Sequence, residues 1–330
     1  MTRSLIILHP GSLGDVLLAV PAIRRLHARY SGLETLLIAR DAVSRFLGAC
    51  RVIDDWMSLE GPAGVGLFSM GVQLPHELET WLNRCDVAVA WMEDSAGALR
   101  ARFQELNVPQ IRIQSPSSPT LRARHQSHRF LETVEEPVDD GFSDHFIQIP
   151  SCLVEEGMVC LERLGVPRGR TFVLVHPGSG SAHKCLNSET LAVIIQSLDE
   201  KGVLPIVIEG PADQQAVRHV LQASSRRPLI LRNLDLTALA GVLVQARFFL
   251  GHDSGVTHLA ALLGVRTVAV FGPTDPDRWA PLGDHVTIVR GPSCLCRSWE
   301  AVRQCHEKPC LDVPTEEILT PLDASGLAMF

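Results

Sequence analysis

Short apolar runs alternate with segments of helical spacing along most of this 330-residue chain, which predicts an α/β protein. In the first half, strands are expected at 5–8, 34–38, 87–91 and 110–113, with helices between them. Apolar residues recur at helical spacing over 15–30, where Pro21 predicts a kink. The stretch 114–145, rich in Ser, Pro and charged residues, is expected to form a loop.

The second half alternates more regularly, and its pattern predicts a parallel, doubly wound sheet. Strands are expected at 172–175, 204–208, 229–231, 248–251 and 267–270, and helices at 188–200, 211–223, 236–245 and 256–263. A helix over 152–164 precedes Gly165-Val166-Pro167, which is expected to be the hinge between the halves. The sequence therefore predicts two domains, residues 1–165 and residues 166–330.

The tetrapeptide His-Pro-Gly-Ser occurs twice, at 9–12 and at 176–179, each time between a short apolar run and a helical pattern. In open parallel sheets, ligands bind where loops leave the carboxyl ends of the strands. One copy in each half predicts two nucleotide-binding-type domains. The alternative is a chance echo, because Pro-Gly is common turn chemistry.

Composition and charge argue against a nucleic-acid-binding or membrane-spanning protein. A formal net charge of −7 and a pI near 6.0 argue against a nucleic-acid partner. The apolar runs are shorter than the roughly 18 residues of a membrane span, and the first of them is too short for a signal peptide. We therefore expect a cytoplasmic protein whose nine cysteines are reduced.

The first candidate site is the loop that contains Gly14 and Asp15. It lacks the third glycine of the dinucleotide fingerprint, but it places a carboxylate at the first turn of a helix. Asp15 could accept a proton from a substrate hydroxyl as a general base. Alternatively, it could simply cap the helix and interact with the helix dipole.

Two loops of the second half have the features of anion-binding sites. Residues 177–184 (PGSGSAHK) combine backbone N–H groups, hydroxyls and a lysine, although the Walker A ending is absent. The alternative is a flexible surface loop. Residues 251–258 (GHDSGVTH) place a helix N-terminus and a hydroxyl beside a possible ligand. His258 lies one turn into that helix, where a histidine serves either packing or catalysis.

Four segments, taken together and in order, resemble the heptosyltransferase family (glycosyltransferase family 9): LHPGSLGDVLLAVPAIRRL, VHPGSGSAHK, FFLGHDSGVTHLAALLGV and VAVFGPTDP. Those enzymes transfer heptose from ADP-heptose to the lipopolysaccharide inner core. The resemblance implies the α/β GT-B fold, in which two doubly wound Rossmann-like domains with mostly parallel sheets face a central cleft. It also implies that residues 1–165 bind the acceptor and residues 166–330 bind the ADP-sugar.

The resemblance implies a role for each matching residue. Asp15 matches the family's proposed catalytic base, and Gly14 lies beside it on the acceptor side. The implied nucleotide-sugar and phosphate site comprises Ser179, Gly180, Ser181, Lys184, Asp213, Asp253, Ser254, Gly255 and His258. Relatives often carry a tryptophan two residues after the lysine, whereas this chain has Leu186. That departure leaves the identity of the donor sugar open.

An anionic core-oligosaccharide or lipid A-type acceptor calls for local positive charge. The dense basic cluster of the first half contains Arg122, Arg124 and Arg129, which we expect to bind the acceptor. The alternative is a solvated basic loop that the following acidic run offsets. A lipid-linked acceptor would also bring the protein to the cytoplasmic face of the inner membrane as a peripheral contact.

We expect neither a cofactor nor a metal. Asp275-Pro276-Asp277 lies within GPTDP, which the family uses without a dedicated metal. Cys294, Cys296, Cys305 and Cys310 lack the paired spacing of most zinc sites, so a metal site and simple thiols both stay open.

The sequence thus predicts an inverting glycosyltransferase in which Asp15 activates the acceptor and Lys184 stabilises the leaving diphosphate. Two alternatives remain: a nucleotide-sugar isomerase or epimerase of the same fold, and a degenerate nucleotide-sugar binding protein. ADP release distinguishes the three, because it requires an acceptor in the first case, occurs without one in the second and is absent in the third.

Overall fold

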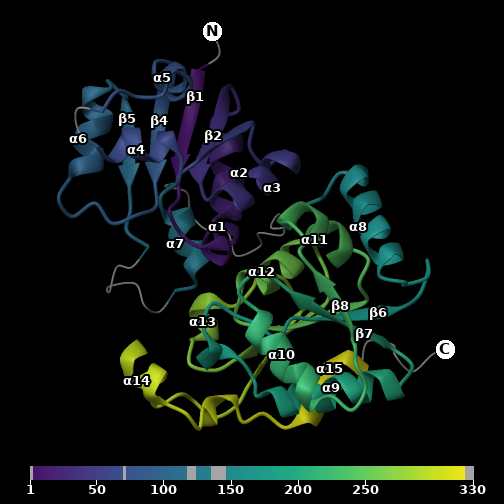
Figure 1. The fold of residues 1–330 in the computed structure, drawn as a ribbon. Helices are drawn as coiled ribbons and strands as arrows, with labels where there is room; N and C mark the ends of the chain where they lie inside the picture. Colours follow the sequence, from purple (N-terminus) through teal and green to yellow (C-terminus); the bar gives the residue numbers. More distant parts are fainter. Residues whose placement is uncertain (1–2, 70–71, 117–123, 135–145, 324–330) are drawn as a thin grey trace. The chain divides into compact units, whose positions relative to one another are not determined.

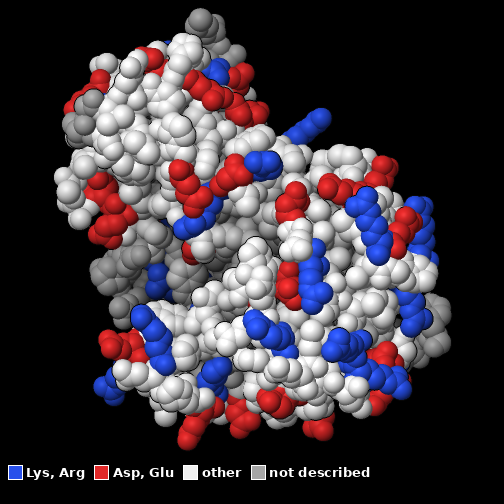
Figure 2. Space-filling view, in the orientation of Figure 1, with Lys and Arg blue, Asp and Glu red and all other residues white. Residues whose placement is uncertain are grey.

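The computed structural model describes residues 3–69, 72–116, 124–134 and 146–323 (Figure 1). The chain divides into two compact units, Met1–Ile147 and Gln148–Phe330. No helix in these ranges is both long enough and apolar enough to cross a bilayer. On the face drawn in Figure 2, basic and acidic side chains are interspersed over the surface.

The first unit is a five-stranded parallel sheet of order β3-β2-β1-β4-β5 with helices around it. Its strands are β1 (Arg3–Leu8), β2 (Leu33–Ala39), β3 (Asp55–Ser58), β4 (Cys85–Ala90) and β5 (Gln110–Ile113). Its helices are α1 (Leu13–Leu18), α2 (Val20–Arg29), α3 (Asp41–Ala49), α4 (Pro62–Phe68), α5 (His76–Leu82), α6 (Ala98–Glu105) and α7 (Gln126–Glu132). The central strand β1 is buried from Ser4 onward, as expected for a parallel strand covered on both faces.

The second unit is a six-stranded parallel sheet of order β11-β10-β9-β6-β7-β8. Its strands are β6 (Phe172–Val175), β7 (Leu204–Glu209), β8 (Leu229–Arg232), β9 (Phe248–His252), β10 (Thr267–Phe271) and β11 (Val286–Arg290). Its helices are α8 (Ser151–Arg163), α9 (Ser188–Glu200), α10 (Gln214–Ala223), α11 (Leu236–Leu243), α12 (Gly255–Leu262), α13 (Pro276–Trp279), α14 (Trp299–Gln304) and α15 (Thr315–Asp323), with 3₁₀ turns at Ala182–Lys184 and Pro309–Leu311.

Both sheets have the strand order of doubly wound folds. In each, successive strands are added on one side of the first strand and then on its other side, so the order reverses there. The reversal lies between β1 and β4 in the first unit and between β6 and β9 in the second. Loops that leave these strands diverge and open a crevice for ligands. Both His-Pro-Gly-Ser copies begin directly after β1 or β6, so they lie at these two points.

The division between the units lies earlier than the predicted boundary at 165/166. Helix α8 packs closely on α11 of the second unit: a Cβ on Gly157 would lie 2.1 Å from the Gly241 carbonyl carbon. The Gln245 side chain also donates to the Val154 carbonyl oxygen, 3.3 Å away. Gly165, with φ +83°, follows the end of α8 within this unit, so 165–167 is a helix-terminating turn.

Several elements are absent from the sequence prediction, among them the C-terminal helices α13, α14 and α15. The edge strands β3 and β11 are absent from the predictions, because β3 has no apolar run and β11 is only partly buried. Helix α7 lies within the stretch 114–145 that we expected to be a loop. The His125 side chain caps it by accepting from Ser127 N, and its buried residues include Phe130 and Leu131. The predicted kink near Pro21 is confirmed as a break at Ala19 between α1 and α2.

Candidate active site

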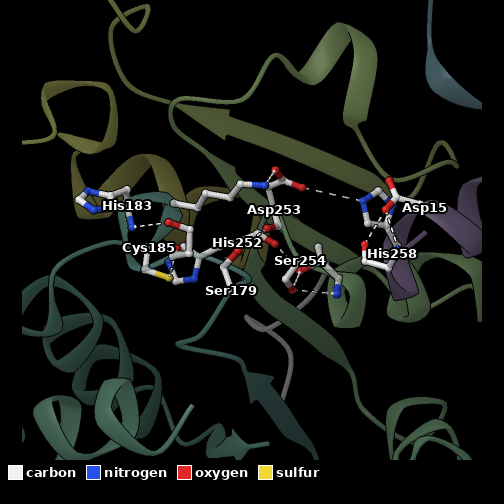
Figure 3. A network of polar contacts seen from close by, with 12 residues as sticks. Asp15, Ser179, His183, Cys185, His252, Asp253, Ser254 and His258 are labelled. Atoms are coloured by element: carbon white, nitrogen blue, oxygen red, sulfur yellow. Dashed lines mark hydrogen bonds and ion pairs between the residues drawn. The ribbon is translucent and has the colours of Figure 1, made fainter. Parts of the chain in front are cut away.

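Loops after β6 and β9 meet at the switch point of the second unit and bring a lysine and an aspartate together. Lys184 Nζ lies 2.7 Å from Asp253 Oδ2, and the Asp253 side chain is 9% exposed (Figure 3). Ser179 Oγ donates to the Asp253 carbonyl oxygen at 2.6 Å, which ties the two loops together. A buried carboxylate therefore holds the lysine ammonium in one place.

The start of α12 completes this side of the site. Ser254 is the N-cap of α12, and Gly255 is its first residue. Thr257 N donates to Ser254 Oγ at 3.4 Å, a long contact for this capping bond. The buried His258 places Nε2 4.0 Å from Asp253 Oδ1 (Figure 3). The predicted residues Lys184, Asp253, Ser254 and His258 are thus brought together.

A buried histidine connects this cluster to Asp213. His176 Nε2 lies 3.0 Å from Asp213 Oδ2, and His176 Nδ1 lies 3.3 Å from Ser254 Oγ. Gly210 N also donates to Asp213 Oδ2, at 2.9 Å. Burial alone would raise the pKa of Asp213, but the bonds from His176 and Gly210 hold it below its usual value. His176 was not among the predicted site residues, although its position in the repeated tetrapeptide was an available signal.

Glycine is required at 178 because Asp213 occupies the space of a side chain. A Cβ there would lie 1.7 Å from Asp213 Oδ1. By contrast, an added Cβ at the exposed Gly180 meets no atom within 4 Å. The Ser181 hydroxyl accepts from His183 N at 3.3 Å and so caps the 3₁₀ turn that ends at Lys184. The Gly/Ser loop is therefore an ordered structure.

A pocket of about 290 Å³ opens beside Asp213. It lies between the beginnings of α9 and α10, and Gly178, Asp213, His219 and Lys308 are among its lining residues. The Lys308 ammonium donates to the carbonyl oxygens of Ala182 and Cys185, at 2.7 and 3.5 Å. Lys308 therefore anchors the loop that bears Lys184 and also lines the pocket.

An aromatic ring reaches Lys184 from a distant part of the chain. The centroid of the Trp299 ring, at the start of α14, lies 5.5 Å from Lys184 Nζ. Leu186, two residues after Lys184, is buried in the hydrophobic core of the unit. Sequence reasoning missed Trp299, since its separation from Lys184 along the chain gives no sign of contact.

The first unit holds Asp15 at the corresponding switch point. Asp15 Oδ2 accepts from the backbone N and the hydroxyl of Ser12, at 2.9 and 2.7 Å. The carboxylate thus interacts with the start of α1, as the capping interpretation expects. Capping by Oδ2 does not exclude proton transfer at Oδ1, and the base role stays a prediction. Gly14 is buried in the first turn of α1.

The neighbouring His9 is a neutral, buried imidazole. Its Nδ1 accepts from Gly11 N at 3.1 Å, so Nε2 carries the proton. The rings of Trp91 and Phe130 surround it, with centroids 5.7 and 5.2 Å away. Burial lowers the pKa of His9 to about 4, against a smaller opposing effect of Asp15.

Two arginines of the predicted acceptor cluster, Arg124 and Arg129, lie within the described residues, and both have partners inside the first unit. Arg122 lies outside the described residues. Arg129 is 1% exposed, and its guanidinium donates to the carbonyl oxygens of Pro116 and Ser115, at 2.7 and 3.3 Å. Arg124 forms an ion pair with Glu132 at 2.8 Å. Arg129 is therefore a structural residue, because its charge satisfies backbone carbonyls inside the unit.

The Asp-Pro-Asp motif and the C-terminal cysteines were the two candidate metal-binding motifs. Asp275 caps α13 by accepting from Asp277 N at 3.1 Å. Cys294, Cys296, Cys305 and Cys310 are free thiols. Desolvation and neighbouring thiols raise the pKa of Cys296 and Cys310 to about 11. Within the described ranges, no three His, Cys, Asp or Glu side chains are grouped so that they could hold a metal ion.

Comparison with known proteins gives consistent matches. The model of "Glycosyltransferase family 9 (heptosyltransferase)" matches residues 136–310, slightly over half of the chain. Lipopolysaccharide heptosyltransferase 3 of Escherichia coli is 25% identical over 130 residues, 38% of each chain. Lipopolysaccharide heptosyltransferase 1 of Pseudomonas aeruginosa is 35% identical over 97 residues, 29% of this chain and 25% of that protein. The chain thus aligns with less than two fifths of these curated relatives.

Solved structures match over a longer range. The family 9 glycosyl transferase of Veillonella parvula has a TM-score of 0.77 at 16% identity, with 98% of each chain covered. The E. coli ADP-heptose lipopolysaccharide heptosyltransferase II has a TM-score of 0.75 at 16% identity, again with 98% of each chain covered. At these identities the likeness shows the fold, and it confirms the predicted pair of Rossmann-like GT-B domains.

Proposed function

The chain belongs to glycosyltransferase family 9 (heptosyltransferase), and we propose that it transfers a heptose from ADP-heptose to an inner-core lipopolysaccharide acceptor with inversion. The main support for this proposal is the Lys184–Asp253 ion pair at the switch point between β6 and β9. A fixed cation beside the amino end of a helix is suited to a diphosphate. The curated relatives are lipopolysaccharide heptosyltransferases, which supports this acceptor class.

The second unit provides a divided donor site. We assign the nucleoside to the pocket beside Asp213 and the diphosphate to Lys184, Ser179, Ser254 and the amino end of α12. A diphosphate adds negative charge next to Asp253. Lys184 must then compensate two anionic groups, and its role grows as the leaving group develops charge.

The first unit provides the base. We assign proton removal to Oδ1 of Asp15, the oxygen that the capping bonds do not use. The acceptor hydroxyl gives its proton to Asp15, and its oxygen attacks the anomeric carbon from the face opposite the diphosphate. The new C–O bond forms as the bond to the diphosphate breaks, and ADP leaves with the electron pair. The proposed acceptor is lipid-linked, so a peripheral membrane contact belongs to this proposal.

The test measures ADP release from ADP-heptose, with and without a heptose-free lipopolysaccharide core acceptor. We expect release only with acceptor, and Asp15→Asn should lower kcat by about 10²- to 10⁴-fold, the usual contribution of a general base. ADP affinity by calorimetry should stay unchanged in this variant.

Ser12→Ala is the matched control. It removes the 2.7 Å hydroxyl bond to Asp15 but keeps the carboxylate, so turnover should stay near that of the wild type. Equal losses in both variants would show that Asp15 acts only through its cap. Release without acceptor would favour the isomerase-type alternative, and the absence of any release would favour a binding protein.

A further inference from the structure

We propose that Trp299 forms the wall of the donor site that contacts the transferred sugar and thereby distinguishes an ADP-sugar from ADP. The inference rests on the proposed function for the identity of the donor. It concerns a residue outside every motif of the sequence analysis. Its basis is the position of the indole ring beside Lys184 and the anchoring of the segment that carries it.

The indole ring lies at the site and is accessible. Its centroid is 5.5 Å from Lys184 Nζ, and Trp299 is 45% exposed. Lys184 is itself paired with Asp253, so the ring borders the ion pair to which we assign the diphosphate. Tryptophan provides a large, rigid apolar face, and exposed examples are typical of binding surfaces. A group next to the diphosphate would therefore find a flat apolar wall here.

The segment that carries Trp299 has a capped helix at Trp299 and is anchored to the rest of the unit after it. The Ser298 hydroxyl accepts from Ala301 N at 3.2 Å and fixes the start of α14. Further along, the Lys308 ammonium donates to the Ala182 carbonyl oxygen at 2.7 Å. Leu311 then packs so closely on Gly272 that an added Cβ would lie 2.7 Å from it. Lys308 thus ties the segment that follows α14 to the loop 177–184, which bears Lys184.

The arrangement of the donor site indicates which part of the donor the ring contacts. The described residues that line the pocket beside Asp213 include neither Lys184 nor Trp299. A nucleoside in that pocket and a diphosphate at Lys184 leave the sugar as the part that reaches the ring. The C–H faces of a sugar pack well on an indole face, since both are apolar and flat. Trp299 should therefore add affinity for ADP-heptose that ADP alone does not receive.

The experiment compares ADP and ADP-heptose by calorimetry for the wild type, Trp299→Ala and Trp299→Phe. We expect Trp299→Ala to weaken ADP-heptose binding about three- to tenfold, the scale of one aromatic contact. ADP affinity should change less than twofold, and Trp299→Phe should restore most of the lost affinity. Leu295→Ala is the control in the same segment, since Leu295 is 89% exposed; it should change neither affinity.

Tryptophan fluorescence gives a second readout that a merely structural role would not move. ADP-heptose should quench wild-type emission more than ADP does, and the difference should vanish in Trp299→Phe. If Trp299→Ala weakens ADP and ADP-heptose binding equally, or leaves both affinities unchanged, Trp299 does not contact the sugar and the proposal is wrong. If the wild type binds ADP-heptose more tightly than ADP but transfers no heptose, the proposed function is wrong and the role of Trp299 in sugar binding is retained. A wild type that binds neither ligand overturns both.

Discussion

The two His-Pro-Gly-Ser loops share a sequence and a place in the fold but differ in chemistry. Each follows the first strand of its unit at the switch point of the sheet. In the first unit, His9 is surrounded by aromatic rings. In the second, His176 lies between Asp213 and Ser254.

The difference shows that the tetrapeptide sets the course of the backbone, while the loop from the adjacent strand sets the chemistry. The strand across the first switch point, β4, is followed by the apolar Trp91. The strand across the second, β9, is followed by Asp253 and Ser254. A repeated motif therefore predicts a repeated position in the fold, and the residues it meets decide what binds there.

Acidification should test both units at once, because each has a buried neutral imidazole. Burial lowers the pKa of His9 to about 4 and, with the nearby His176, that of His252 to about 3. Between these values and the unfolded value near 6.5, the unfolded chain binds more protons, so stability falls as the pH falls. From pH 7 to pH 5 we expect each imidazole to remove about 2 kcal/mol.

Urea unfolding at the two pH values measures this loss. The variants His9→Gln and His252→Gln should each flatten the pH dependence in one unit, whereas His76→Gln, at an exposed position, should not. If the pH dependence of the unfolding free energy stays unchanged in His9→Gln, His9 is not the buried group that destabilises the first unit at low pH.

Lys184→Ala tests the difference between the two His-Pro-Gly-Ser loops, since we assign the diphosphate only to the loop of the second unit. We expect ADP and ADP-heptose binding to weaken by about 1.5–3 kcal/mol, the scale of a hydrogen bond to a charged group. Calorimetry measures the loss. Lys201→Ala removes the same charge at an exposed position after α9 and should leave the affinity unchanged. If both variants lose affinity equally, the effect is general electrostatics.

Glycine substitutions test how tightly each loop is packed. Gly178→Ala places a Cβ 1.7 Å from Asp213 Oδ1, and Gly11→Ala places one 2.6 Å from His9 Cε1. We expect each to cost about 1–3 kcal/mol of stability, the usual cost of overpacking. Gly180→Ala, which meets no neighbouring atom, should change the unfolding free energy by less than about 0.5 kcal/mol. Tolerance at 178 would mean that Asp213 moves freely, against its bonds to His176 and Gly210.

The smallest effect is expected at Arg124, in the first unit. Its ion pair with Glu132 is exposed on the arginine side, so Arg124→Gln should cost no more than about 1 kcal/mol. Arg129→Gln should cost more, because it removes the two hydrogen bonds that the buried guanidinium donates to the carbonyl oxygens of Ser115 and Pro116. Thermal unfolding compares the two variants. A reversed order would restore Arg129 as a candidate for acceptor binding.

Much of the fold was predictable, since buried parallel strands such as β1, β6 and β9 are short apolar runs. The edge strands β3 and β11 were missed because partial burial gives a weaker pattern, whereas the edge strands β5 and β8 were predicted. The candidate site was predicted where residues are close in sequence, as in Asp253 to His258. Partners that meet only through folding, such as Lys184 with Trp299 and His176 with Asp213, leave no trace in local spacing. Arg129 was misread because a basic residue in a polar stretch gives no sign of burial.

Lys308 has one more consequence, for covalent labelling. The chain contains three lysines: Lys184 belongs to the loop 177–184 (the donor loop), Lys308 donates to that loop, and Lys201 follows α9. An amine-directed reagent such as an acetylating agent or formaldehyde with a reductant therefore has few side-chain targets in this arginine-rich chain. Lys201 should react first, since it is exposed. The extent of labelling at the other two then reports, residue by residue in a mass spectrum, how often the donor loop opens.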